Sequence, residues 1–172
     1  MDRKEFWKRF KSGERDFSGV DFKGIRLASL DLTGIILIEA SLSGCDLVDT
    51  MFHHANLEGT CFQGANLDGA NFQHSNLRRA NFDSSILIRA FFSECNGDEA
   101  VFTNIDDLIL TNFYFSSFRK SIWTGTGFHP ECVVSDVDFT EAIDCLVDYS
   151  SASYVSNVVL PSGEITESLD ER

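Results

Sequence analysis

The stretch that decides the fold runs from Ala55 to Ser84 and reads ANLEG TCFQG ANLDG ANFQH SNLRR ANFDS. Every fifth residue in it is Leu or Phe, and the residue two positions before each of these is small. The Leu or Phe spacing continues unbroken from Phe17 to Phe92. A fixed internal period of this kind indicates a solenoid, in which each repeat stacks on its neighbours instead of folding alone.

A period of five fits neither an α-helix nor a β-strand, so the chain must turn once in every repeat. Four short extended segments joined by turns close a coil of about twenty residues, and adjacent coils pair like neighbouring strands about 4.8 Å apart. One large apolar side chain per repeat then fills the interior. The predicted core consists of these central residues: Phe17, Phe22, Leu27, Leu32, Leu37, Leu42, Leu47, Phe52, Leu57, Phe62, Leu67, Phe72, Leu77, Phe82, Leu87 and Phe92.

Counting in twenties assigns the phenylalanines to two opposed walls of the coil. Phe62 and Phe82 fall on one wall and Phe52 and Phe72 on the wall opposite, while leucines dominate the other two walls. Volume matching explains this division, because four Phe rings in one layer would overpack a narrow tube and four Leu side chains would leave gaps.

The pattern resembles that of the pentapeptide repeat family, whose consensus is roughly small, Asp or Asn, Leu or Phe, and two variable residues. The similarity covers about residues 16–160. It implies an all-β solenoid, a right-handed quadrilateral β-helix, for which we expect about seven coils. The resemblance is specific for the fold and weakly specific for activity, although some members of the family resemble B-form DNA in width and charge, dimerise through their C-terminal coils and bind DNA gyrase.

The register of the repeat breaks near residues 97–107 and again near residues 129–133. Gly97 occupies a central position, where we expect a bend or bulge. Beyond the second break we expect the central positions to include Tyr154 and Val159. The predicted organisation is an N-terminal capping helix at 1–14, the β-helix at 15–160, and an acidic, disordered tail at 161–172.

The N-terminal segment supplies a cover for the first coil. Phe6, Trp7 and Phe10 fall at helical spacing among Lys and Arg residues, and Gly13 can stop the helix. We interpret residues 2–12 as an amphipathic helix over the open end of the core. A basic amphipathic helix can also bind a membrane surface, but this apolar face is short for that role, so no membrane partner is expected.

Composition bounds the remaining possibilities. The chain has 172 residues, of which 43% are hydrophobic, as expected for one domain. It has no apolar segment typical of a secretory signal. Five cysteines form an odd set without metal-finger spacing, which favours a reducing cytoplasm. We expect no cofactor.

Charge is distributed unevenly along the chain, whose formal net charge is −13. Residues 1–89 hold 11 basic and 12 acidic residues, whereas residues 90–172 hold 3 basic and 15 acidic residues. Direct binding to nucleic acid is disfavoured, because phosphate contacts require basic side chains. The acidic half either keeps the protein soluble or competes with nucleic acid for a basic groove. The candidate surface for such competition comprises Asp136, Asp138, Glu141 and Asp148.

Histidine supplies the only weak candidates for a metal site. His53, His54 and His74 fall on one wall when the register is counted in twenties, and neutral imidazoles bind zinc or copper. No phosphate-binding loop, dinucleotide-binding motif or nucleophile elbow occurs, so we expect no enzymatic activity.

Three classes of function therefore remain open. We favour a non-enzymatic scaffold that binds an unidentified protein partner. The first alternative is an acidic DNA mimic that binds DNA gyrase or another nucleic-acid-binding protein and forms a homodimer through its C-terminal coils. The second alternative is metal binding by the histidine column.

Overall fold

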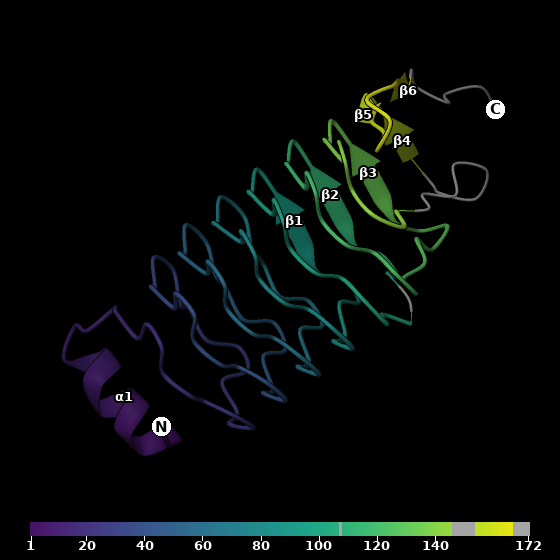
Figure 1. Ribbon diagram of the computed structural model, residues 1–172. Coiled ribbons are helices and arrows are strands. Elements are labelled where there is room, and N and C mark those ends of the chain that lie inside the picture. The colour runs from purple at the N-terminus through teal and green to yellow at the C-terminus, as the bar shows by residue number, and fades with distance from the viewer. Residues whose placement is uncertain (107, 146–153, 167–172) are drawn as a thin grey trace.

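Backbone pairing between residues twenty apart holds the chain in a stack of coils, as the computed structural model shows (Figure 1). In the N-terminal half, Asp16 bridges Ile36 and Ile36 bridges Asn56, and every such bridge is parallel. The structure describes residues 1–106, 108–145 and 154–166. Because each coil pairs with the next along the axis, the backbone groups of neighbouring coils satisfy one another.

Each repeat places one central side chain inside and then turns. In the first repeat, Val20 N–H donates to Phe17 O at 3.2 Å, and Gly19 between them has a left-handed φ of 67°. Asn or Asp just before the central residue supports the turn, as where Gln73 N–H donates to Asn71 Oδ1 at 2.9 Å. Asn and Asp recur just before the central residue because their side-chain oxygen accepts this turn hydrogen bond. Four such turns per coil give the solenoid four walls.

The sixteen central residues from Phe17 to Phe92 are at most 1% exposed. Their aromatic rings form two columns. Phe72 stacks on Phe52 with centroids 5.3 Å apart and on Phe92 at 5.0 Å, while it meets Phe82 of the other column edge-to-face at 5.7 Å. Both arrangements are favourable for aromatic rings.

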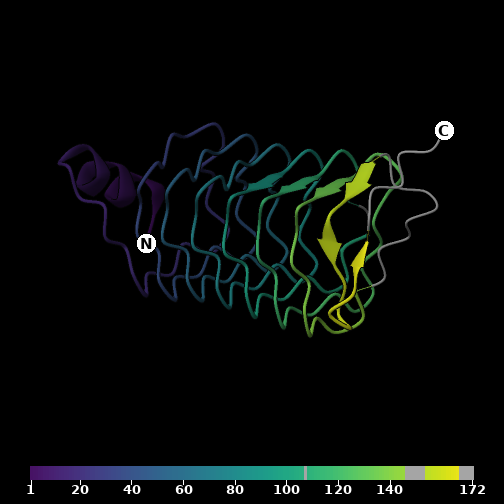
Figure 2. The same ribbon diagram turned by 90° about the horizontal axis from the view of Figure 1, so that it is seen from above.

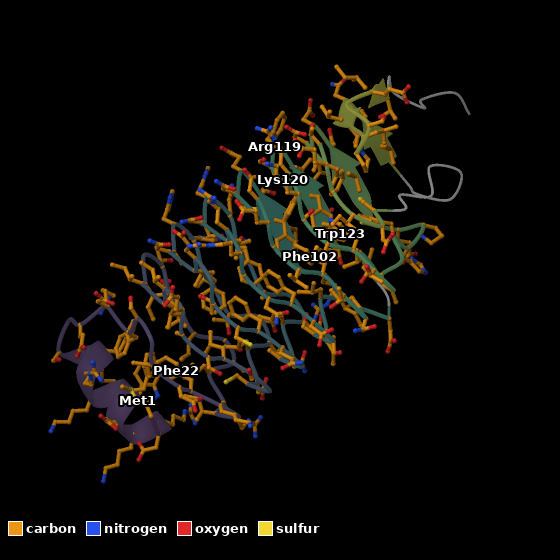
Figure 3. The ribbon with its side chains drawn as sticks, in the orientation of Figure 1. Met1, Phe22, Phe102, Arg119, Lys120 and Trp123 are labelled. Atoms are coloured by element: carbon orange, nitrogen blue, oxygen red, sulfur yellow. The ribbon has the colours of Figure 1, made fainter. Side chains whose placement is uncertain are left out.

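The second column ends at Trp123, which lies 4.2 Å from Phe102 in a nearly parallel stack (Figure 3). Its Nε1–H donates to Ser121 Oγ at 2.6 Å, so the buried indole keeps a hydrogen-bond partner.

The first break in register inserts one residue at a corner without interrupting the ladder. Asn76 bridges Asn96 at a separation of twenty, whereas Asn96 bridges Ser117 at a separation of twenty-one. The bend or bulge expected at Gly97 does not occur, because Gly97 N–H donates to Ser117 O at 2.7 Å and the pairing continues on both sides. The extra residue lies between the buried residues Ile105 and Leu108, at the end of the predicted break.

Two further single-residue insertions follow. Asn112 pairs with Val133 at a separation of twenty-one, as the break near residues 129–133 requires. Val133 in turn pairs with Tyr154, again twenty-one apart, which reveals a third insertion that the sequence analysis missed.

The third insertion corrects the expected register of the last coil. Val155 pairs with Val134 and is 6% exposed, so Val155 and not Tyr154 is the central residue. Val159 bridges Asp138, the residue just before the central Phe139. Leu160, and not Val159, is therefore the central residue of its repeat. A count by fives fails here because no Phe follows Phe139 and the Val and Tyr residues of the last coil fit either register.

Regular strands are short and are concentrated on one wall. Strands β1 (Phe91–Ser93), β2 (Asn112–Tyr114), β3 (Val133–Ser135) and β4 (Tyr154–Ser156) form a parallel sheet in that order, which we call the sheet wall. In the coils before β1, the central residues of the sheet wall include Phe52 and Phe72. The other walls consist of isolated bridges.

A small antiparallel hairpin lies at the end of the last coil. It consists of β5 (Val158–Val159) and β6 (Ile165–Thr166), joined by a turn. A disordered tail is predicted from residue 161, but residues 161–166 instead complete this hairpin. Residues 167–172 lie outside the described part of the chain.

Helix α1 (Arg3–Lys11) covers the opposite end of the stack (Figure 2). Asp2 caps it by accepting the Glu5 N–H at 2.8 Å. Phe6 is fully buried, with its ring 5.1 Å from Phe17 and 5.5 Å from Phe22. The helix thus closes the first layer of the core with an aromatic side chain.

The other two cap candidates are only half-buried. Phe10 stacks on Phe6 at 5.4 Å, and Trp7 lies 6.0 Å from Phe6 with Lys11 Nζ 5.3 Å above its indole. Within the described residues, no helix is long and apolar enough to cross a membrane.

Candidate interaction surface

The chemistry of this molecule lies on its outer walls, because side chains fill the interior. A hollow of about 280 Å³ occurs beside the first insertion. It is lined by Ser84, Ser85, Ile86, Ile88, Asn104, Ile105 and Asp106. Only one ionisable side chain borders it, so it lacks the converging polar groups that an active site requires.

One wall carries a series of ion pairs between successive coils, and we call it the charged wall. Its central residues include Leu77, Gly97 and Phe118. Its ion pairs are Arg79 with Glu58 at 2.6 Å, Arg78 with Glu99 at 2.8 Å, Arg119 with Asp138 at 3.8 Å and Lys120 with Glu141 at 3.7 Å. Pairs this exposed add little stability, but they offset the negative charge of the wall.

Two of the four predicted acidic residues therefore have cationic partners. Asp138 and Glu141 lie beside Arg119 and Lys120, which project from the outer surface in Figure 3. The charged wall is not a continuous acidic ridge along these coils.

Asp136 lies apart from this pair, at the end of β3 on the sheet wall. Its Oδ1 accepts from Asn157 Nδ2 at 3.1 Å, and its Oδ2 accepts from Ser135 Oγ at 2.6 Å. The fourth predicted residue, Asp148, lies outside the described residues. The structure thus divides the predicted acidic surface between two walls.

The histidines do not converge on a ligand position. The rings of His54 and His74 stack in parallel, with centroids 4.7 Å apart, and His53 is not part of this stack. His74 Nδ1 lies 3.4 Å from Glu94 Oε2. In the part of the chain that the structure describes, no group of three His, Cys, Asp or Glu side chains could hold a metal ion. The predicted trio is therefore a stacked pair with a separate neighbour.

The five cysteines are free and mostly buried. Burial raises the pKa of Cys95 and of Cys145 to about 12, and it also raises the pKa of Cys45 and Cys132. Such thiols stay protonated near neutral pH and are poor nucleophiles. Cys61 is half-buried, with its Sγ 3.2 Å from Ser43 Oγ.

Exposed aromatic side chains are the feature that the sequence analysis missed. Phe115 is 66% exposed and Phe91 is 42% exposed, and both belong to the sheet wall. The sequence contained a signal, because Phe115 stands two residues after the central Phe113, at the turn position that Gly and polar residues usually occupy. Counting only the central residues leaves such a side chain unnoticed.

Comparison with known proteins agrees with the repeat and its geometry. Residues 15–92 match the family model for the pentapeptide repeat region. Residues 15–92 are a pentapeptide repeat region. A pentapeptide repeat chain is expected to turn once every five residues and to pair at a separation of twenty, as this one does.

Several solved structures of pentapeptide repeat proteins resemble this one at low sequence identity. A protein from the thylakoid lumen of Arabidopsis thaliana is 21% identical, with 84% of this chain and 86% of that chain covered and a TM-score of 0.46. Rfr23 from the cyanobacterium Cyanothece is 16% identical, with 81% and 97% covered and a TM-score of 0.45.

QnrB1, a plasmid-mediated fluoroquinolone resistance protein, is 19% identical, with 80% and 78% covered and a TM-score of 0.33. None of the curated proteins compared with this pentapeptide repeat chain matches it.

Proposed function

We propose that this pentapeptide repeat protein is a non-enzymatic scaffold that binds a protein partner through its outer walls. The observation that carries this proposal is the filled interior, in which the central residues and two aromatic columns leave no space for a substrate. Recognition must then use the walls, whose side chains differ from face to face. A rigid, repetitive rod is well suited to present such surfaces.

The finer features of the scaffold belong to the same proposal. We infer a right-handed solenoid of about seven coils that acts in the cytoplasm without a cofactor. Buried, protonated thiols and the absence of a converging histidine trio favour binding over catalysis.

An acidic DNA mimic that binds DNA gyrase or another nucleic-acid-binding protein is the second candidate. It is favoured by the 15 acidic and 3 basic residues of the segment 90–172. The ion pairs of Asp138 and Glu141 weaken it, because mimicry of a duplex needs an uninterrupted row of negative charge. A homodimer joined through the C-terminal coils would belong to this second candidate.

A quantitative pull-down at increasing salt concentration distinguishes the protein-binding scaffold from the acidic DNA mimic. We expect the scaffold to lose only part of its capture when ionic strength rises from about 0.15 M to 1 M, because screening weakens charged contacts and leaves apolar contacts in place. The paired substitution Asp138→Asn and Glu141→Gln should leave capture unchanged. Loss of capture in high salt and in this variant, together with inhibition or protection of gyrase supercoiling, would instead support the mimic.

A further inference from the structure

We propose that Phe115 and the two carboxylates beside it, Glu94 and Asp136, form a docking surface for a basic helical segment of a partner protein. We call these three residues the Phe115 corner. The inference rests on the proposed scaffold function, since it assigns partner binding to one wall and one chemistry.

The backbone at Phe115 is unfavourable for a large side chain. Its φ is 46°, in the left-handed region that bulky L-residues rarely adopt. Among the described non-glycine residues with positive φ, only Leu110 and Phe115 are apolar. The ring is also 66% exposed, so burial does not compensate for the backbone conformation. Strain combined with an exposed aromatic ring indicates a role outside folding.

The three residues occupy the same turn position in successive coils. Glu94 N–H donates to Tyr114 O at 2.8 Å, and Phe115 N–H donates to Ser135 O at 3.1 Å. Coils stack about 4.8 Å apart, so the Cα atoms of Glu94 and Asp136 are separated by about 10 Å. Phe115 lies between them along the corner.

The charge of this surface is negative and is not balanced by Lys or Arg. The strands of the sheet wall and the turn residue after each of them contain two charged residues, Glu94 and Asp136. No described Lys or Arg forms an ion pair with either carboxylate, in contrast to Asp138 and Glu141 on the charged wall. His74 lies beside Glu94 at 3.4 Å and carries charge only when it is protonated.

An exposed ring between two carboxylates favours a cationic partner. Carboxylates form charge-assisted hydrogen bonds with Lys and Arg, and the face of an aromatic ring also attracts cations. Phe91 is a second exposed apolar side chain on the same wall, and Asn112 separates it from Val133 along the ladder. A second copy of this chain is a poor occupant, because a symmetric contact would bring these carboxylates against their own equivalents.

The spacing of the carboxylates selects the secondary structure of the partner. In an α-helix, residues i and i+7 lie on one face and are about 10.5 Å apart, close to the separation of the two carboxylates. An apolar residue at i+3 or i+4 would then cover Phe115. Same-face residues of a β-strand recur about every 6.8 Å and match this separation poorly.

Synthetic helical peptides test this surface on the full chain. The probe is an Ala-rich peptide with Lys at i and i+7 and Leu at i+3 and i+4, and the control peptide carries Glu in place of both Lys. Fluorescence anisotropy measures binding to the wild-type chain and to three variants. These are Phe115→Asn, the pair Glu94→Gln with Asp136→Asn, and the matched control Leu110→Asn, which alters the other exposed apolar side chain at a left-handed turn.

We expect the Lys peptide to bind the wild type and the Glu peptide not to bind. Phe115→Asn and the paired amide variant should each weaken binding by at least tenfold, whereas Leu110→Asn should change it less than about twofold. Asn tolerates the left-handed conformation, so a thermal melt should show that Phe115→Asn folds normally.

Three results of the peptide experiment would overturn the inference: no binding of the Lys peptide at millimolar concentration, equal binding of the Glu peptide, or undiminished binding by Phe115→Asn. A wild-type dimer that Phe115→Asn dissociates in sedimentation equilibrium would assign the surface to a second copy and also overturn it. A natural partner captured equally by wild type and Phe115→Asn would preserve the scaffold function while rejecting this docking surface.

Discussion

The ring of Phe118 occupies the space that Gly97 leaves at the centre of its repeat. A Cβ atom added to Gly97 would overlap Cδ1 and Cε1 of that ring. Both residues are central residues of the charged wall, one coil apart, and the three coils before them carry Leu37, Leu57 and Leu77 at this position. Gly97 therefore leaves the space that the ring of Phe118 fills on this wall.

This relationship predicts that Gly97→Ala destabilises the protein by about 1–3 kcal/mol, because overpacked cores must displace side chains or backbone. Urea unfolding measures the loss. Phe118→Leu in the same chain should recover part of it, since a smaller side chain gives room for the methyl group. A double-mutant cycle with no coupling between the two sites would contradict the packing described above.

Substitutions at central positions should destabilise the protein far more than substitutions at exposed turns. We expect Phe72→Ala to cost about 3–5 kcal/mol, because Phe72 contacts four other rings through stacked and edge-to-face geometry. Lys23→Ala, on an exposed turn, should stay within about 0.5 kcal/mol of the wild type. Equal effects at the two positions, measured by urea unfolding, would rule out this register.

The cap should depend on Phe6 more than on Trp7. Phe6→Ala removes the fully buried ring that packs on Phe17 and Phe22, and we expect it to cost about 3 kcal/mol and to promote aggregation from the uncovered first coil. Trp7→Ala removes a half-buried ring and should cost less. Thermal melts combined with light scattering compare the two variants, and the opposite order would argue against capping by Phe6.

Most of the fold follows from counting by five, because the central position must be large and apolar in every repeat. Counting also locates the insertion before Leu108, since the Phe series resumes one residue late. It does not locate the insertion before Val155, where Val and Tyr fit either register. Nor does it reveal that pairing continues through Gly97, where the ring of Phe118 from the next coil fills the space.

The surface was less predictable than the core. Negative charge could be counted from the sequence, but its pairing depends on which turn residues stack. Asp138 and Glu141 face Arg119 and Lys120 across an insertion that shifts the register by one. A stretch without Lys or Arg can therefore be partly neutralised by the preceding coil.

Asp83 should contribute to stability in a pH-dependent way. Hydrogen bonds from Thr103, Asn104 and Gln63 lower the pKa of its carboxyl group. Because the pKa is lower in the folded protein, the stabilisation is present above the unfolded-state value near pH 4 and is lost as pH falls through the folded-state pKa.

Asp83→Asn should accordingly lower stability at pH 7, by less than about 1 kcal/mol because the carboxylate is close to water. The difference from wild type should vanish at acidic pH, where the wild-type carboxyl is also neutral. Chemical unfolding at both pH values provides the measurement, and a difference that persists in acid would show that the charge of Asp83 is unimportant.

Thiol labelling should distinguish Cys61 from the other cysteines. Burial raises the pKa of Cys95 and Cys145 to about 12, so almost none of these thiols ionises at pH 8. We expect an aromatic disulfide reagent to modify one thiol rapidly in the native protein, at Cys61, and all five after denaturation. Rapid native labelling of Cys95 would contradict its burial.

The chain carries two intrinsic optical reporters at opposite ends of the solenoid. Trp123 is enclosed by Phe102, Phe118 and Phe139, and Trp7 is half-exposed on α1. Coils of a solenoid contact only their neighbours, so either end can fray without the other. Indole emission from Trp7→Phe and Trp123→Phe variants can therefore reveal from which end unwinding starts, without an attached dye.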